Sequence, residues 1–387
     1  MRFSSIQDAW VAAHNHDDFT AEIASCTWED ALMWLESVQA FPKVVWHGRH
    51  EAGTYFGIGM TTSEKQSVAL TVRSFDASEP QWTNFPNSLT IHPQHLLKWT
   101  PKGCTLESFS FSVPFPNSHG LDPQDIRELP TKPEWAEKIE HCKTLFQRNT
   151  LQKIVLARQS CFDLSNPWNK FRALYNTQQH CYHFLVQPTA ERCFFGASPE
   201  KLFSKNSDTL ETEALAGTAP ISGNDEQDQQ LATELLESQK NQAEHHIVLR
   251  YLHTQLSDLE KSHHTHPQDL VTLSHVQHLR TRVSYQIQSS VSLDQIIDRL
   301  HPTPAVCGLP SSVARREISR IEPFHRGWYA GTMGLINREN ANFTVLIRSA
   351  LWIQGQGYTW SGAGIVAGSE PVAEWNEINN KAKQFLG

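Results

Sequence analysis

Ser361-Gly362-Ala363-Gly364-Ile365-Val366 is a glycine-rich stretch near the end of the chain, and Glu374-Trp-Asn-Glu377-Ile-Asn-Asn-Lys381 follows it. The second segment has helical character, so Glu374, Glu377 and Lys381 share one face. Two carboxylates and one ammonium on a single face can hold a metal ion and an anionic ligand together. The alternative is a solvated face with a weak pair between Glu377 and Lys381, but this leaves the glycines unexplained.

The composition is that of an ordinary globular protein. The chain has 387 residues, 39% of them hydrophobic, which suits one large domain or two closely packed ones. A net charge of −8 without a dense Lys/Arg block argues against nucleic acid or an acidic membrane as the partner. The polar start and the lack of a long apolar run predict a cytoplasmic location, and seven cysteines without CxxC spacing fit reduced thiols.

A polar, proline-marked segment over about 117–133 divides the chain. Before it, strand-like runs such as 41–46 and 68–72 alternate with turn residues. We therefore predict a sheet-rich N-terminal subdomain over residues 1–130. A second region over residues 131–387 is expected to pack with it as one compact body.

Helices and strands are expected to alternate in this second region. The patterns predict a helix over 134–147 and strands over 153–157 and 182–186. A single long helix over 228–259 would place Glu237 and Glu244 on nearly the same face, toward the C-terminal helix. The run His263-His264-Thr-His266 is expected to be a solvated loop in preference to a metal site.

Three polar residues stand at positions where chemistry is plausible. Lys153 interrupts an apolar strand, where burial would favour the neutral amine of a general base. Glu200 follows Gly196-Ala-Ser-Pro199, which is expected to be a tight turn at the mouth of a cleft. Arg348 ends the strand-like run 343–347, and its planar guanidinium can grip a carboxylate. The alternatives are a solvated edge-strand lysine, a solvated turn carboxylate and a surface arginine.

Taken in order, nine segments resemble those of the chorismate-binding enzymes. The likeness covers about Pro133 to the C-terminus, and Trp46-His-Gly-Arg49 adds a loose likeness in the N-terminal third. The segments are Lys153-Ile-Val-Leu-Ala-Arg158, Gly196-Ala-Ser-Pro-Glu200, Glu213-Ala-Leu-Ala-Gly-Thr218, Glu244-His245, His301-Pro-Thr-Pro-Ala-Val-Cys-Gly308, Gly327-Trp-Tyr-Ala-Gly331, Arg348, Ser361-Gly-Ala-Gly364 and Glu374 to Lys381.

The resemblance implies a fold and a reaction class. The fold would be a layered α+β body, like that of anthranilate synthase component I, with two large, mainly antiparallel sheets flanked by helices. Residues 131–387 would be the chorismate-binding catalytic region. The family comprises isochorismate, salicylate, anthranilate and aminodeoxychorismate synthases, which are Mg²⁺-dependent enzymes acting on the same dianionic cyclohexadiene.

The resemblance also implies roles for single residues. Lys153 would be the general base that activates water, and Glu200 the general acid that protonates the departing hydroxyl. Glu244 and Glu377 would bind Mg²⁺ directly, with Glu374 acting through water. The substrate would contact Gly217, Thr218, His301, Tyr329, Arg348, Gly362, Gly364 and Lys381.

Two positions narrow the reaction within the family. Ammonia-using anthranilate synthases generally carry Gln where Lys153 stands, so the lysine favours water as nucleophile. Aminodeoxychorismate synthases commonly carry a nucleophilic Lys at the position of Ala216. The resemblance therefore implies an isomerase that converts chorismate to isochorismate by adding water at C2 and losing the C4 hydroxyl. No glutaminase subunit is expected.

Several alternatives stay open. The N-terminal likeness favours the menaquinone pathway over siderophore biosynthesis, and a salicylate synthase would make the same intermediate and then eliminate pyruvate. A catalytically silent chorismate-binding protein is the alternative outside the enzymes. Two departures bear on detail: Asn241 stands where relatives often have an acid near the metal, and Ile221 stands where many have an arginine.

Overall fold

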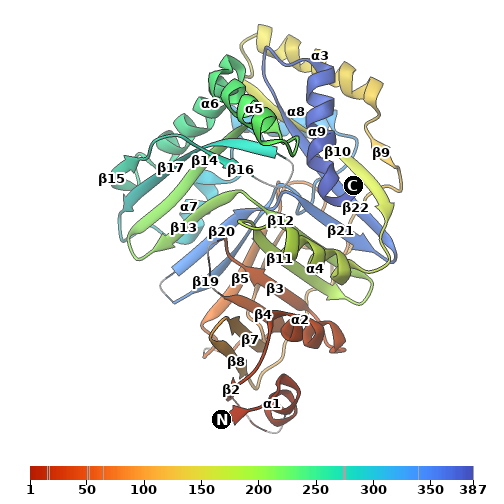
Figure 1. The fold of residues 1–387 in the computed structure, drawn as a ribbon, viewed down its shortest axis with the longest axis vertical. Coiled ribbons are helices and arrows are strands. Elements are labelled where there is room, and N and C mark those ends of the chain that lie inside the picture. Colours follow the sequence, from red (N-terminus) through yellow and green to blue (C-terminus); the bar gives the residue numbers. More distant parts are fainter. Residues whose placement is uncertain are drawn as a thin grey trace.

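Figure 1 shows a chain built around two β-sheets, with the N-terminus at one end of the molecule and several helices gathered at the other. The C-terminus lies among these helices, far from the N-terminus. The computed structural model describes residues 1–14, 16, 18–49, 51, 53–63, 65–272, 276–338 and 340–386.

The larger sheet joins strands from distant parts of the chain. β3 (Lys43–His47) pairs antiparallel with β11 (Tyr182–Thr189), so the N-terminal third extends the sheet of the C-terminal part. Among the described strands only β1 (Arg2–Phe3) and β2 (Phe19–Ile23) pair in parallel. In spatial order the sheet contains β1, β2, β8 (Gly103–Ser108), β7 (His95–Thr100), β4 (Thr54–Ile58), β3, β11, β12 (Arg192–Ser198), β21 (Ser349–Ile353), β22 (Gln356–Ile365), β10 (Lys153–Asp163) and β18 (Gly308–Leu309), with β9 (Glu128–Leu129) also on β10.

The second sheet is built in the same way. β5 (Val68–Arg73) pairs antiparallel with β19 (Thr332–Asn337), which again joins the two parts of the chain. In spatial order this sheet contains β15 (Glu260–Thr265), β17 (Val276–Ile287), β14 (Thr209–Pro220), β13 (Lys201–Asn206), β20 (Asn340–Val345), β19, β5 and β6 (Ser88–Ile91), with β16 (Asp269–Thr272) also on β17.

Local signals explain where several helices begin. Ser292 and Gln295 form a capping box at the start of α7 (Leu293–Leu300), and α9 (Pro371–Leu386) opens with proline, whose φ suits the first turn.

No helix in the described part of the chain combines the length and the apolar character that crossing a membrane requires. The other helices are α1 (Ile6–Ala13), α2 (Trp28–Ser37), α3 (Lys132–Gln147), α4 (Pro167–Thr177), α5 (Asp225–Glu237), α6 (Gln239–Leu256) and α8 (Ser311–Ile321).

The larger sheet separates two hydrophobic clusters. Neighbouring side chains of a strand point to opposite faces, and both Val45 and Trp46 on β3 are fully buried. Trp46 packs in the cluster that includes Leu70 and Phe343 of the second sheet. Val45 packs on the other face in the cluster formed with helices α1, α2 and α4. The larger sheet is therefore covered by helices on one face and by the second sheet on the other.

The expected α+β fold with two large, mainly antiparallel sheets flanked by helices is confirmed. The helix expected over 134–147 and the strands over 153–157 and 182–186 are present as α3, β10 and β11. The division into regions 1–130 and 131–387 stays a prediction.

The single helix expected over 228–259 is wrong. Ser238 has an extended backbone, with φ of −66° and ψ of 111°, and its side chain accepts a hydrogen bond from the backbone N–H of Asn241. It therefore caps α6 and separates that helix from α5. Glu237 and Glu244 lie on different helices, so the shared face predicted for them does not exist.

Two smaller expectations also need correction. His263 and His264 belong to the exposed strand β15, which is paired to β17, and not to a loop. Gly196, Ala197 and Ser198 end strand β12 instead of forming a tight turn, because Gly196 pairs with Ser349 of β21.

Candidate active site

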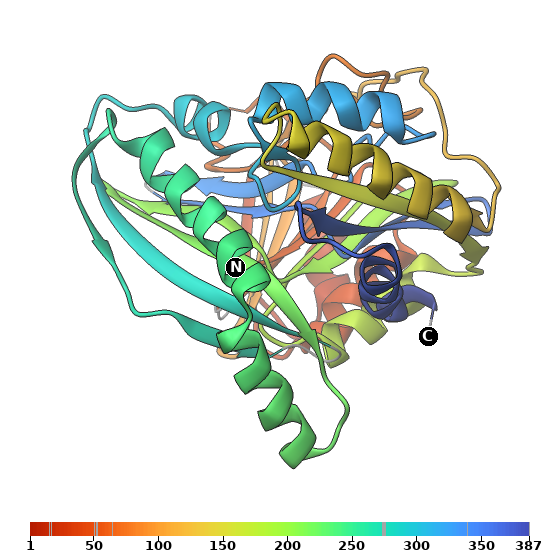
Figure 2. The same cartoon turned by 90° about the horizontal axis from the view of Figure 1, so that it is seen from above.

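Most residues that the sequence singles out line one narrow cavity of about 70 Å³. It lies where β10 and β22 of the larger sheet approach β14 of the second sheet, and α6 and α9 supply residues from above. Figure 2 shows these two helices lying over the strands. The predicted residues that line the cavity are Glu200, Gly217, Thr218, Glu244, Tyr329, Arg348, Gly362, Gly364 and Lys381.

Lys153 lies beside this cavity with its side chain fully buried. Its Nζ is 2.9 Å from Oε1 of Glu244 on α6, so the ammonium has an acidic partner in the protein interior. Gly364 makes room for the pair, because a Cβ there would lie 2.3 Å from Glu244 Oε1 and 3.0 Å from Lys153 Cε. The alternative of a solvated edge-strand lysine is thereby excluded.

Glu200 is a buried carboxyl group between β12 and β13. The hydroxyl of Thr303 donates to its Oε1 at 3.4 Å. Burial raises the pKa of Glu200 to about 7, the Lys153 ammonium acts against this shift, and the Glu213 carboxylate adds to it. A carboxyl group with such a pKa is protonated in a large fraction of molecules at neutral pH, as a general acid must be.

Two further lysine–glutamate pairs lie near the cavity, and Lys240, Glu374 and Glu377 line a second cavity of about 260 Å³, which shares Thr218 with the first. Nζ of Lys240 on α6 is 2.6 Å from Oε1 of Glu374 on α9, which ties the two helices together. Nζ of Lys381 is 2.7 Å from Oε1 of Glu377 and also donates to the carbonyl oxygen of Gly362 at 2.9 Å. The face predicted for Glu374, Glu377 and Lys381 is therefore directed toward α6 and the glycine-rich strand, and not toward solvent.

The surrounding charges shift the acids in opposite directions. Burial acts to raise the pKa of Glu244, but the ammonium groups of Lys153 and of other nearby lysines outweigh it, and the pKa lies below its ordinary value. Burial and the neighbouring Glu377 carboxylate raise the pKa of Glu374, with Lys240 opposing them. Glu244, Glu374 and Glu377 are thus three neighbouring acids, each of which forms an ion pair with a lysine.

The donor set near the cavity is of the kind that a hard cation prefers. Glu244, Glu374 and Glu377 offer carboxylate oxygens only, and Glu374 Oε2 is buried without a hydrogen-bond partner. Their chemistry fits Mg²⁺. Within the described ranges, however, no three acidic, histidine or cysteine side chains approach closely enough to form a metal cluster, and each of these acids is paired with a lysine.

The opposite side of the cavity is built for an anion. Arg348 has a left-handed backbone with φ of 52°, and its buried Nη2 has no hydrogen-bond partner. Burial lowers the pKa of the Arg348 guanidinium, which nevertheless stays protonated near neutrality. Tyr329 stacks on Trp360 with ring centroids 5.7 Å apart, and burial raises the pKa of its hydroxyl. A carboxylate would find a preformed charge and a hydroxyl donor here.

His278 lines the cavity although the sequence pattern did not single it out. It sits on β17 opposite Thr218 of β14, and Thr218 Oγ1 lies 3.0 Å from its Nδ1. Burial lowers the pKa of His278 well below its ordinary value, so the ring is neutral. The local sequence gives no clear signal for this histidine, because it stands in the mixed polar run Val276-Gln277-His278-Leu279 and reaches the cavity through the pairing of β17 with β14.

His301 is placed elsewhere. Its Nε2 is 3.3 Å from the carbonyl oxygen of Ser74, and it is not among the residues that line the cavity. Thr303, two positions along the chain, is the residue of this segment that reaches Glu200.

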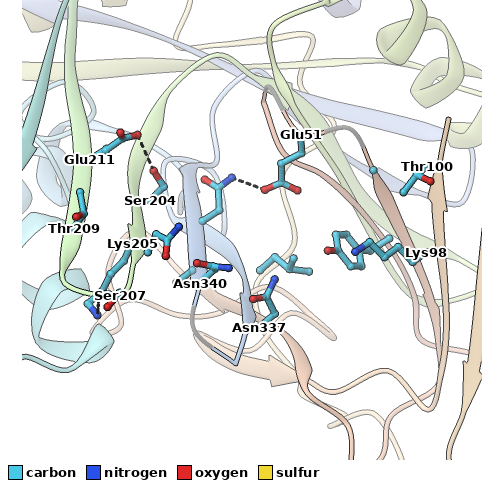
Figure 3. Close-up of a pocket in the computed structure, with 16 residues that line it drawn as sticks. Glu51, Lys98, Thr100, Ser204, Lys205, Ser207, Thr209, Glu211, Asn337 and Asn340 are labelled. Carbon is cyan, nitrogen blue, oxygen red and sulfur yellow. Dashed lines mark hydrogen bonds between the residues drawn. The ribbon is translucent and has the colours of Figure 1, made fainter. Parts of the chain in front are cut away.

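A larger and more open cavity of about 880 Å³ lies between β4 and β7 of the larger sheet and β13, β14, β19 and β20 of the second sheet. Figure 3 shows Lys98 and Thr100 on one side of it and Ser204, Lys205 and Glu211 on the other. None of the predicted site residues lines this cavity. Size therefore does not identify the site, whereas the convergence of acidic and basic groups does.

Comparisons with known proteins show the family to which the chain is similar. Residues 114–387 match the model of the family described as chorismate binding enzyme. An isochorismate synthase, MenF, from Pasteurella multocida is 31% identical over 380 residues, which cover 91% of this chain and 88% of that protein. The solved structure of the menaquinone-specific isochorismate synthase MenF from Escherichia coli is 28% identical and superposes with a TM-score of 0.82 over 98% of this chain and 97% of that one. Anthranilate synthase component I from Streptococcus pneumoniae, at 20% identity and a TM-score of 0.69 over 90% of this chain and 91% of that one, shares the fold.

Proposed function

This chain belongs to the chorismate-binding enzymes, and we propose that it is an isochorismate synthase, which isomerises chorismate to isochorismate. The observation that carries the proposal is the meeting of three features in or directly beside one cavity. These are a buried amine on β10, a carboxyl group with a pKa near neutrality, and cationic groups suited to a dianion.

The two halves of the reaction divide between Lys153 and Glu200. Lys153 takes a proton from a water molecule whose oxygen bonds to C2 of the ring. The double bonds of the ring shift, the C4–oxygen bond breaks, and Glu200 donates a proton to the departing hydroxyl. One water enters and one leaves, so the mass of the substrate does not change.

Lys153 must be neutral when it accepts the proton. In the structure its Nζ lies 2.9 Å from Oε1 of Glu244. Glu244 is therefore the partner that Lys153 has to give up before water is activated. Gly364 allows this exchange, because the absence of a side chain there leaves space beside both groups.

The substrate is held by charge and by close backbone approach. The guanidinium of Arg348 and the hydroxyl of Tyr329 receive one carboxylate, and the ammonium of Lys381 adds positive charge beside Gly362. Gly217, with φ of 82°, places its backbone and the Thr218 hydroxyl at the cavity wall. These contacts orient C2 toward Lys153 and C4 toward Glu200.

Mg²⁺ is the cofactor that this donor set suits. Glu244 and Glu377 would hold the ion, with Glu374 acting through water, and the bound ion would neutralise the ring carboxylate of the substrate. By the resemblance to the family, Asn241 would leave the neighbourhood of the ion with one acid fewer than in many relatives.

The pathway proposed is menaquinone biosynthesis, in the cytoplasm. Support comes from the relatives named MenF, which match this chain over most of its length, and from the structure of the menaquinone-specific enzyme.

Product analysis tests the function. Purified protein is incubated with chorismate and Mg²⁺ without ammonia, and the products are resolved by chromatography and mass. Isochorismate, with the mass of chorismate, is expected. Salicylate together with pyruvate would instead identify a salicylate synthase, and binding without any product would identify a silent binding protein.

A further inference from the structure

A buried ion pair joins the N-terminal third of the chain to the segment that carries Glu200. The side chains of Arg49 and Glu213 are only 3% and 1% exposed. Nη2 of Arg49 donates to Glu213 Oε2 at 2.7 Å, and Nη1 donates to the carbonyl oxygen of Pro199 at 2.5 Å. Because Pro199 directly precedes Glu200, one guanidinium holds both a second carboxylate and the backbone beside the proposed acid.

The pair has features that a purely structural contact would not need. Burying two charges costs free energy that their attraction only partly returns. Arg49 Nε and Glu213 Oε1 are also buried without hydrogen-bond partners, so the network is incompletely satisfied. Arg49 lies outside residues 114–387, which match the family model, and follows β3 in the larger sheet.

Several charged groups face Glu200 from the surrounding elements. Lys153 on β10 and Lys381 on α9 favour its ionised form, whereas Glu213 on β14 favours its protonated form. Tyr329, which precedes β19, also interacts with it electrostatically. Arg49 bears on this balance in two ways, since it brings a positive charge next to Pro199 and compensates the charge of Glu213.

We propose that Arg49 and Glu213 are positioning residues for Glu200, with Arg49 fixing the backbone at Pro199 and the charges of the pair setting how readily Glu200 gives up its proton. The inference rests on the proposed function, in which Glu200 is the general acid. It assigns a role in the reaction to a residue of the N-terminal third.

The pH dependence of kcat/KM distinguishes this role from a structural one, because activity must fall as Glu200 loses its proton. The alkaline limb is the part of the kcat/KM profile in which activity falls with rising pH. Glu213→Gln removes a negative charge that favours protonated Glu200, so we expect this limb to move to lower pH by about half a unit. Arg49→Met removes a positive charge and is expected to move it in the opposite direction by a similar amount. In the Arg49→Met/Glu213→Gln variant the limb should lie between those of the two single variants.

Arg49→Lys separates charge from geometry. A lysine keeps the positive charge but has no planar fork to reach Pro199 and Glu213 together. We expect the alkaline limb to stay near that of the unmodified protein while kcat falls about tenfold, because the acid is held less accurately. Thermal unfolding and circular dichroism show whether each variant folds. If Arg49→Met does not fold, the test rests on Arg49→Lys and Glu213→Gln.

Arg192→Met is the matched control. Arg192 lies on β12, the strand that leads to Pro199, and forms an ion pair with Asp122 at 2.7 Å. Its loss should leave the alkaline limb unchanged. Shifts of the Arg49 and Glu213 variants in the same direction, or no shift in either, would overturn the inference while the unmodified protein still forms isochorismate. Absence of product from the unmodified protein would instead refute the proposed function.

Discussion

The space beside Gly364 is what lets Lys153 and Glu244 meet. Gly364→Ala would place a methyl group 2.3 Å from Glu244 Oε1, so one member of the pair has to move. Because a displacement of about 1 Å at a reacting group can cost roughly a hundredfold in rate, we expect kcat/KM to fall by between ten- and about a hundredfold. Gly368→Ala is the control, since no heavy atom lies within 4 Å of its Cβ position. Equal activity of the two variants would contradict the argument.

Lys153→Ala removes the proposed base. Water addition is expected to slow by about 10² to 10⁴-fold, the range that general base catalysis contributes, while the fold is retained. Lys98→Ala, at the larger cavity, is the matched lysine control and should keep full activity. Initial rates with saturating chorismate, together with circular dichroism, provide the measurement. Substantial turnover by a well-folded Lys153→Ala protein would refute the assignment.

Glu200 makes the reaction sensitive to pH in a defined direction. Its pKa is raised to about 7, so the protonated form that donates to the leaving hydroxyl is lost as the pH rises through that value. The rate kcat/KM should therefore fall between about pH 7 and pH 8. A profile that stays level through this interval would show that Glu200 is not the group that donates the proton.

Among the helices, α6 and α9 carry the acids proposed to hold Mg²⁺, and lysines now compensate them. Glu377→Gln removes the negative charge of one carboxylate. We expect the affinity for Mg²⁺ to fall about tenfold and the rate of turnover to fall with it. Calorimetric titration with Mg²⁺ measures the affinity without turnover. Glu370→Gln, an exposed position before α9, makes the same charge change as a control. Superimposable titrations of the two variants would contradict the metal assignment.

Prediction from sequence succeeded for elements whose pattern is local. The apolar run of β10 and the spacing of Glu374, Glu377 and Lys381 on α9 need no distant partner to be recognised. The break at Ser238 was missed because the polar, helix-compatible pattern continues across it. A single side chain bonded to the backbone of Asn241 is enough to end one helix and begin the next.

The remaining parts of the site depend on contacts across the whole molecule. Lys153, Glu200 and Glu244 could be named from motifs, whereas His278 reaches Thr218 only through the pairing of β17 with β14. The approach of Arg49 to Pro199 likewise requires the order of strands in the larger sheet. Periodicity along the chain does not specify that order, so the resemblance, and not the residue pattern, supplied the topology.

In the proposed reaction this cavity adds water at C2 and expels the C4 hydroxyl. The most direct test is to incubate the protein with chorismate and Mg²⁺ in water enriched in oxygen-18 and to analyse the product by mass spectrometry. We expect isochorismate with one heavy oxygen, located at C2. Isochorismate that carries no heavy oxygen would mean that the hydroxyl migrates within the substrate, and it would contradict the roles given to Lys153 and Glu200.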